Sequence, residues 1–165
     1  MRICFICTVA ALCLFALGCG SYRAYHIPTP AMEPTIKVGD YAVADEDFYK
    51  SEKPIERFDI VVHKAPLDEN TKKAGTDENS RFVFRVIGLG GEKVEIKKGK
   101  VYINDEPLNE KFQKIDSEDD FGPVVVPENE FFLLGDNRPN SYDSRYWKPS
   151  TIKRENIFGK IIKIY

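Results

Sequence analysis

Apolar and polar positions alternate in short runs over most of the chain, and glycine, proline or acidic residues separate these runs. From Tyr22 onward, no long stretch places apolar residues at the i, i+3, i+4 spacing of an amphipathic helix. The pattern predicts a mostly β body with one core, because 165 residues are close to the usual size of one domain. The expected strands are 41–44, 59–63, 82–87, 93–96, 101–103, 124–126, 130–134 and 159–164.

Turn-forming residues mark the connections between these strands. Gly99 predicts a hairpin turn between the strands at 93–96 and 101–103, and Asn104-Asp105 predicts another turn after them. Residues 67–80 and 113–120 are polar and charged. We expect both to be solvated loops rather than sites.

The N-terminal segment differs from the rest of the chain. Ile3 to Cys19 carries no charge, and this run is long for the core of a signal peptide and short for a membrane span. Arg2 precedes the run, so the positive-inside rule keeps the N-terminus in the cytoplasm and places the body on the extracytoplasmic side. We therefore expect a membrane anchor or lipoprotein-type signal over residues 1–21 and a β domain over residues 22–165.

Two kinds of anchor fit this run. In one, the run stays as an uncleaved helix. In the other, the segment Ala16-Leu17-Gly18-Cys19 resembles a lipoprotein box, with cleavage before Cys19 and lipid attached to its thiol. The fit is imperfect, because the bulky aliphatic residue of that box is one place late at Leu17. Both anchors stay open, whereas a buried core helix is disfavoured because the run has no polar face at helical period.

Composition excludes several classes of function. The net charge is -2 and no basic stripe is interleaved with aromatic residues, so we do not expect nucleic acid as a partner. All four cysteines lie in the first nineteen residues, which leaves the body without thiols for a disulfide scaffold or a zinc site. His26 and His63 have no partner at metal-ligand spacing. No metal or other cofactor is expected.

Three stretches point to a chemistry. They are residues 27–36 (IPTPAMEPTI) followed by Gly39-Asp40, residues 84–92 (FRVIGLGGE), and residues 135–147 (GDNRPNSYDSRYW). In this order they resemble the nucleophile segment, the general-base strand and the most specific motif of the type I signal peptidase family. The resemblance extends from Ile27 to Tyr165.

This resemblance implies an antiparallel β-sheet or barrel body whose relatives cut exported precursors after a small residue. In the family, a serine hydroxyl attacks and a lysine, kept neutral by apolar burial, takes its proton. At the matching positions this chain has Ala31 and Phe84. A methyl group cannot attack a carbonyl and a phenyl ring cannot accept a proton, so we expect no intact catalytic residue.

Other motif residues match supporting positions of the family. Thr29 matches a hydroxyl that helps to form the oxyanion hole, and Ser141 matches the hydroxyl that orients the lysine amine. Asp143 and Arg145 match an ion pair that braces the site. The residues expected to hold a bound peptide are Pro28, Thr29, Ala31 and Met32.

The leading hypothesis is a non-catalytic member of this family, attached to the membrane. It would bind exported precursor proteins or their signal peptides by strand addition, with an active paralogue or the secretion and assembly machinery as further partners. Two alternatives stay open. One is an active signal peptidase with a displaced dyad that uses Thr29 as the nucleophile. The other is a structural envelope lipoprotein with a vestigial cleft.

Overall fold

The structure, a computed structural model, describes residues 21–50, 53–112 and 117–165. The strands of this part are β1 (Tyr22–His26), β2 (Tyr41–Asp45), β3 (Ile60–Lys64), β4 (Arg81–Gly88), β5 (Lys93–Lys97), β6 (Lys100–Ile103), β7 (Glu106–Pro107), β8 (Phe121–Val125), β9 (Glu130–Leu134), β10 (Ile152–Lys153) and β11 (Ile157–Ile164). The helices are α1 (Glu69–Lys73) and the 3₁₀ turns η1 (Pro30–Met32), η2 (Arg138–Asn140) and η3 (Arg154–Asn156). The predicted mostly β fold is confirmed. The predicted anchor, with Cys19, lies outside the described residues except for Ser21.

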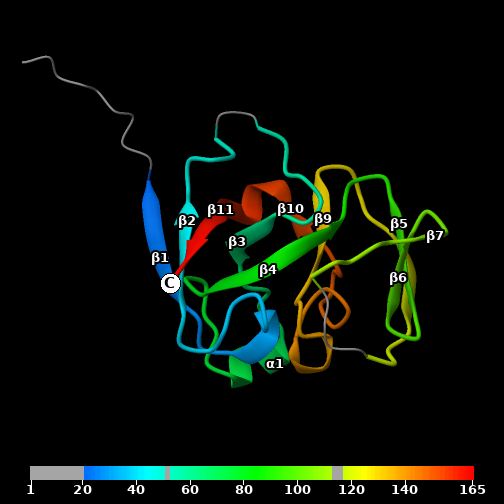
Figure 1. Ribbon diagram of the computed structural model, residues 1–165, viewed down its shortest axis with the longest axis horizontal. Coiled ribbons are helices and arrows are strands. Elements are labelled where there is room, and N and C mark those ends of the chain that lie inside the picture. Colours follow the sequence, from blue (N-terminus) through cyan, green and yellow to red (C-terminus); the bar gives the residue numbers. More distant parts are fainter. Residues whose placement is uncertain (1–20, 51–52, 113–116) are drawn as a thin grey trace, which may run out of the picture.

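Two antiparallel sheets form the body (Figure 1). The larger has the strand order β1-β2-β11-β3-β4-β9-β10, and the smaller, to one side of it, has the order β7-β6-β5-β8. The C-terminal strand β11 therefore joins the β1–β2 hairpin to β3 and β4. The register shifts in β11 between Ile161 and Lys163 and in β4 between Val86 and Gly88. Such bulges bend a strand and increase its twist, which curls the larger sheet.

Each strand predicted from the alternation has a counterpart in the structure, with ends that differ by a few residues. Three strands were not predicted. Four of the five residues of β1 are exposed, so it has no apolar face to produce an alternating pattern. β7 and β10 have two residues each, which is too short for any period.

Both predicted turns are present. Lys98 and Gly99 have φ angles of 48° and 73° between β5 and β6, and Asn104 and Asp105 have φ angles of 52° and 70° between β6 and β7. Two consecutive positive φ angles are typical of the two-residue hairpin turns whose twist matches that of the flanking strands.

The prediction of a loop over residues 67–80 is wrong in part, because this segment contains α1. Asp68 caps the helix: its Oδ1 accepts hydrogen bonds from the N–H groups of Asn70 (2.8 Å) and Thr71 (2.9 Å). The Thr71 hydroxyl accepts from the N–H of Asp68 (3.0 Å), which completes a capping box. The helix has five residues, so an apolar stripe could not show it. Of the second predicted loop, residues 117–120 have no regular structure.

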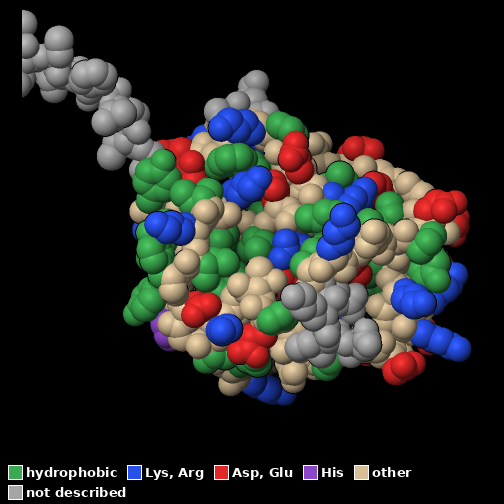
Figure 2. Space-filling model, viewed as in Figure 1, with side chains coloured by type: hydrophobic (Ala, Val, Ile, Leu, Met, Phe, Trp, Pro, Cys, Tyr) green, Lys and Arg blue, Asp and Glu red, His purple; other side chains and the backbone are tan. Residues whose placement is uncertain are grey.

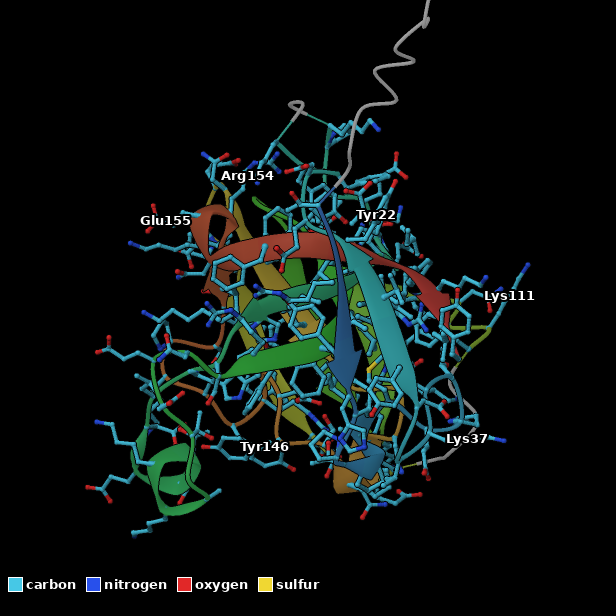
Figure 3. The ribbon with its side chains drawn as sticks, turned by 90° about the vertical axis from the view of Figure 1, so that its left-hand side faces the viewer. Tyr22, Lys37, Lys111, Tyr146, Arg154 and Glu155 are labelled. Atoms are coloured by element: carbon cyan, nitrogen blue, oxygen red, sulfur yellow. The ribbon has the colours of Figure 1, made fainter. Side chains whose placement is uncertain are left out.

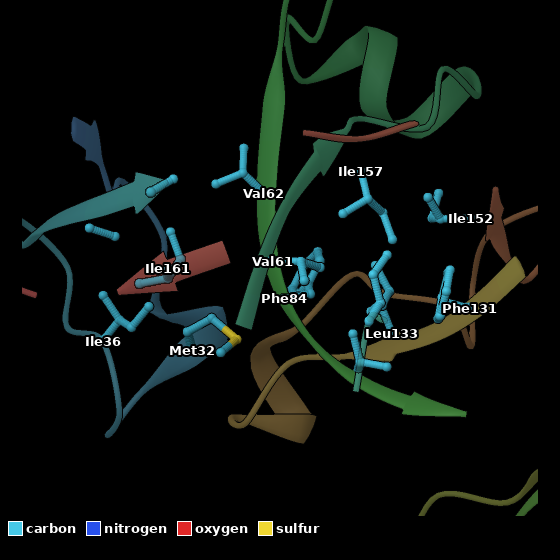
Figure 4. Packing of buried hydrophobic residues seen from close by; sticks show 14 of the residues in the cluster. Met32, Ile36, Val61, Val62, Phe84, Phe131, Leu133, Ile152, Ile157 and Ile161 are labelled. Atoms are coloured by element: carbon cyan, nitrogen blue, oxygen red, sulfur yellow. The ribbon is translucent and has the colours of Figure 1, made fainter. Parts of the chain in front are cut away.

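The core holds the motifs in place. The larger cluster of buried side chains lies against the seven-stranded sheet (Figure 4), and its members include Met32, Ile36, Val61, Phe84 and Leu133. The first motif contributes Met32 and Ile36 to this cluster, and the second motif contributes Phe84. The two motifs are therefore fixed relative to each other by packing rather than by loops alone.

Candidate functional site

The first motif forms a loop between β1 and β2 that backbone hydrogen bonds close. The N–H of Ile27 donates to the carbonyl of Asp40 (2.9 Å), and the N–H of Gly39 donates to the carbonyl of Ile27 (2.8 Å). Pro30 stands at the start of η1, where its fixed φ suits a helical turn. The sequence thus produces a tight turn inside a closed loop.

This turn points its side chains in two directions. Ala31 and Met32 are buried, with 7% and 2% of their surfaces exposed, and Pro28 and Thr29 are exposed. The carbonyl of Ala31 accepts a hydrogen bond from the N–H of Asn137 (3.0 Å), which belongs to the third motif. Ala31 is therefore held between the core and the third motif.

The third motif also brings Ser141 close to Ala31. A Cβ added at Gly135 would lie 2.3 Å from the Ser141 Oγ and 2.5 Å from the Ala31 carbonyl oxygen. Only a glycine fits between them. The Ser141 hydroxyl oxygen is buried and has no hydrogen-bond partner among the described residues. An unpaired buried hydroxyl is costly, so its presence calls for an explanation.

Phe84 lies in an aromatic cluster on the face of β4 that points into the core. Its ring centroid is 5.7 Å from His63, 6.0 Å from Phe82 and 5.7 Å from Trp147, and 5% of its surface is exposed. These distances are typical of favourable aromatic contacts. The side chain that the sequence places at the general-base position is thus part of the core.

His63 is the one polar member of this cluster. Its Nδ1 lies 2.8 Å from the carbonyl oxygen of Lys64, so Nδ1 carries the proton and donates to that oxygen. Its Nε2 is buried without a hydrogen-bond partner among the described residues. Burial lowers the pKa of His63 to about 4, so the ring is neutral at pH 7.

Buried ion pairs connect the second and third motifs. The Arg85 Nε and Nη2 atoms lie 2.8 Å and 2.6 Å from the two carboxylate oxygens of Asp136, which is fully buried. The Arg85 guanidinium also lies over the ring of Phe112, 4.0 Å from its centroid. A bidentate ion pair of this kind fixes the relative orientation of β4 and the loop after β9.

A second pair lies inside the third motif. Arg145 Nε and Nη2 donate to the two oxygens of Asp143 at 2.8 Å and 2.9 Å. Asp143 also accepts from the N–H of Gly135 (3.1 Å), and Arg145 also donates to the carbonyl of Arg138 (2.6 Å). These contacts hold the loop that carries Ser141, and none of them reaches the first motif.

The motifs meet at a cleft of about 260 Å³. Its lining comes from the end of β1, the first motif, the start of β4 and the η2 region: Tyr25, His26, Ile27, Pro28, Thr29, Ala31, Met32, Arg81, Phe82, Val83, Phe84, Asn140 and Tyr142. The four residues predicted to hold a peptide, together with Phe84, thus line one cleft. Within this described lining there is neither a lysine nor a serine.

Backbone edges flank this cleft. Within the described chain, β1 pairs only with β2, and β9 pairs with β4 only from Arg85 onward. On that side, residues 81–84 of β4 therefore have no strand partner. Unpaired main-chain groups at a sheet edge are a template for an added strand.

The sequence did not reveal the wall formed by Tyr142. Its hydroxyl donates to Asp68 Oδ2 (2.8 Å) and accepts from the Asn70 side chain (3.2 Å), so the segment that carries α1 supports the cleft wall. Its ring stacks on Tyr146 with a centroid distance of 5.6 Å, and Figure 3 shows Tyr146 on the side where α1 lies. No pattern signals a contact between residues so far apart in the chain.

No group of three or more histidine, cysteine, aspartate or glutamate side chains in 21–50, 53–112 and 117–165 could hold a metal ion. Over the same ranges, no helix is both long and apolar enough to cross a bilayer.

Comparisons with known proteins agree on one family. Residues 1–165 match the family described as "Signal peptidase, peptidase S26". The chain is 36% identical over 155 residues to "Probable signal peptidase I-2" of Synechocystis sp., covering 93% of this chain and 68% of that protein. It is 36% identical over 157 residues to "Signal peptidase I" of Leptolyngbya laminosa, covering 94% and 75%. A crystal structure of a signal peptidase I from Enterococcus faecalis superposes with a TM-score of 0.53 at 30% identity, covering 67% of this chain and 98% of that one.

Proposed function

The chain belongs to the signal peptidase family, peptidase S26, and we propose that it is a non-catalytic member that binds exported precursor peptides at the membrane without cutting them. One observation carries the proposal. The cleft formed by the three motifs is present, but its described lining contains neither the hydroxyl of a serine nor the amine of a lysine. Acyl transfer by a dyad needs both groups within hydrogen-bonding reach.

The Ala31 position supports the loss of the nucleophile. The turn of η1 and the hydrogen bond from Asn137 hold Ala31 beside Ser141 and the cleft, where the family resemblance calls for the attacking oxygen. A methyl group in this position leaves the chain without a nucleophile there. In another serine protease, loss of the nucleophile or the base costs on the order of a millionfold in rate.

The Phe84 position supports the loss of the base. The ring packs against three other rings, so it is a stable part of the core rather than a displaced side chain. The unpaired hydroxyl of Ser141 fits the same account, because its role in the family is to orient the amine that Phe84 lacks. The family resemblance implies that a lysine amine would be the partner of this hydroxyl.

The remaining cleft suits binding of an extended peptide. The unpaired edge of β4 at residues 81–84 offers main-chain donors and acceptors, and the end of β1 also lines the cleft. We infer that the Thr29 hydroxyl and the Ala31 N–H hold a carbonyl of the peptide. These groups do not depend on the dyad, so binding survives its loss.

The outer face of the β1–β2–β11 end of the sheet supports attachment to a membrane. Tyr22, Tyr41, Ile162 and Tyr165 are exposed there, between 49% and 67% of their surfaces. Figure 2 shows apolar side chains gathered along the edge that β1 forms. Tyrosines with neighbouring lysines suit the boundary between water and lipid. The anchor over residues 1–21, a helix or a lipid on Cys19, would place this face at the extracytoplasmic surface.

Photo-crosslinking tests the proposal. A precursor peptide with alanine one and three positions before the cleavage point carries a photoreactive residue between them, and a matched peptide carries tryptophan in place of both alanines. We expect the uncut peptide to be crosslinked to residues of the cleft, and little crosslinking of the tryptophan peptide. No adduct at the cleft would favour a structural lipoprotein. A shortened peptide that forms with the wild type but not with the Thr29→Ala variant would favour an active enzyme.

The double variant Ala31→Ser with Phe84→Lys provides a second test. If the cleft is intact and only the dyad was lost, cleavage of the same peptide appears in the double variant and in neither single variant. If the double variant binds the peptide but still does not cut it, the positions assigned to the nucleophile and the base are wrong.

A further inference from the structure

The charge on the cleft wall is unbalanced. Arg81 is the only lysine, arginine, aspartate or glutamate among the described residues that line the cleft. The wall therefore carries one permanent positive charge and no carboxylate.

Arg81 is held in place by neutral groups. Its Nη1 donates to the carbonyls of Glu78 (3.2 Å) and Ser80 (3.1 Å), and its guanidinium lies 4.2 Å from the ring centroid of Phe158. None of its hydrogen bonds or ion pairs within the described chain involves a carboxylate. These contacts restrict the guanidinium but leave its charge without a counter-ion.

The other arginines of the described residues differ from Arg81. Five of them form ion pairs with aspartate or glutamate: Arg23, Arg57, Arg85, Arg138 and Arg145. Arg154 donates only to the carbonyls of Tyr49 and Lys53, but the cavity that it lines, of about 630 Å³, also contains Glu46, Glu128, Glu130 and Glu155. Among the arginines of the described residues, only Arg81 lines a cavity whose described lining contains no aspartate or glutamate.

We propose that the cleft selects peptides that present a carboxylate to Arg81, an inference that rests on the proposed peptide binding. Charge-assisted hydrogen bonds from Nε and Nη2 to such a carboxylate would neutralise the charge that no described residue of the cleft neutralises. Two sources share this chemistry: an aspartate or glutamate side chain, and the free carboxylate at the end of a peptide.

The position of Arg81 indicates where the carboxylate lies along the peptide. Arg81 is the first residue of β4 and precedes Phe84 by three positions, which places it about 10 Å along the strand from Phe84. A peptide strand beside β4 has the same rise per residue. The favoured acid is therefore about three residues from the peptide residue that lies over Ala31 and Phe84.

Isothermal titration calorimetry with a set of peptides tests this selectivity. The parent is neutral, blocked at both ends, and has alanine at the two positions before the cleavage point. In the set, one residue at a time becomes aspartate, with asparagine at the same place as the matched control, and one further peptide has a free terminal carboxylate. We expect the peptide with aspartate at one particular position, or the peptide with the free terminal carboxylate, to bind about tenfold more tightly than its neutral control. A higher salt concentration should reduce this ratio of affinities.

Variants of Arg81 and Arg154, the two arginines that donate only to backbone carbonyls within the described chain, provide the test and its control. Arg81→Gln should bring the favoured acidic peptide to the affinity of its neutral control, Arg81→Lys should retain part of the preference, and Arg154→Gln should retain all of it. Equal affinity of acidic and neutral peptides for the wild type, or a preference that survives Arg81→Gln, would overturn the inference and leave peptide binding standing. If the wild type binds none of the peptides, the proposed function itself fails.

Discussion

The free energy of unfolding of the Phe84→Lys variant is a sharp test of how the site is packed. The variant returns an amine to the position where the family resemblance calls for one. In this chain, however, the position is 5% exposed and surrounded by the rings of His63, Phe82 and Trp147. The ring of His63, whose Nε2 is buried without a hydrogen-bond partner among the described residues, is the polar neighbour in this cluster, with its centroid 5.7 Å from that of Phe84.

The magnitude follows from burial. Truncation of a buried phenylalanine to alanine costs about 3–5 kcal/mol, and the lysine stem keeps part of the lost packing. Burial of the amine adds a cost that one acceptor, such as the unpaired His63 Nε2, only partly offsets. We expect Phe84→Lys to lower the free energy of unfolding by about 2–4 kcal/mol at pH 7.

The pH dependence gives the second signature. Burial lowers the pKa of a lysine below its ordinary value of about 10.4. Between the lowered and the ordinary pKa, the unfolded chain binds more protons than the folded chain, so stability rises with pH in that window. Each unit by which the pKa is lowered contributes about 1.4 kcal/mol, which the variant regains as the pH approaches 10.

Urea unfolding at pH 7 and pH 9.5 measures both signatures. Trp147 is the only tryptophan, is 1% exposed and lies 5.7 Å from the Phe84 ring, so its fluorescence reports unfolding of this part of the core. Phe84→Met is the matched control, because it removes the ring without adding an amine. If Phe84→Lys is as stable as the wild type at pH 7, or if the difference in its free energy of unfolding from that of Phe84→Met does not change with pH, then position 84 is not buried in an apolar core.

Three further predictions concern single contacts. Burial lowers the pKa of His63 to about 4, so the unfolded chain binds more protons between pH 4 and 6.5, and the free energy of unfolding should fall by roughly 3 kcal/mol as the pH drops through that window. In urea titrations over the same window, His63→Phe should lose less of its free energy of unfolding than the wild type, and an equal loss would contradict the burial of His63. Asp68→Ala removes the cap of α1 and the acceptor for the Tyr142 hydroxyl, which should cost about 1–2 kcal/mol and speed amide hydrogen exchange in α1, whereas unchanged exchange would show that the capping box is not needed. Asp136→Asn leaves the charge of Arg85 buried without its partner and should lower stability by about 3–5 kcal/mol in denaturant titrations; a loss below about 1 kcal/mol would mean that the pair is not held in the folded state.

Strand positions could be predicted from the sequence because burial on one face leaves an alternating pattern. β1 could not, because its residues are mostly exposed and it is held by pairing with β2. The helix α1 was missed because it is stabilised by the cap at Asp68 rather than by an apolar stripe. Local hydrogen bonds of this kind leave little trace in the period of a sequence.

The site could be predicted only in part, for a similar reason. The motifs predict roles for Ala31, Phe84 and Ser141 through resemblance, and these roles stay predictions. The structure places the Ala31 carbonyl and the Ser141 hydroxyl next to the same point, where a side chain at Gly135 would begin. The environment of His63 and the contact of Tyr142 with Asp68 depend on how distant segments fold together. No pattern within one segment carries that information.

We propose above all that this chain binds precursor peptides and does not cut them. Whether it cuts can be measured by mass spectrometry of a precursor peptide incubated with the full-length wild-type protein in lipid vesicles, with an active signal peptidase as positive control. We expect the peptide to keep its full mass with this chain, whereas the positive control shortens it. A product cut after the small residue, formed by the wild type and lost in Thr29→Ala, would show that the chain is an active enzyme.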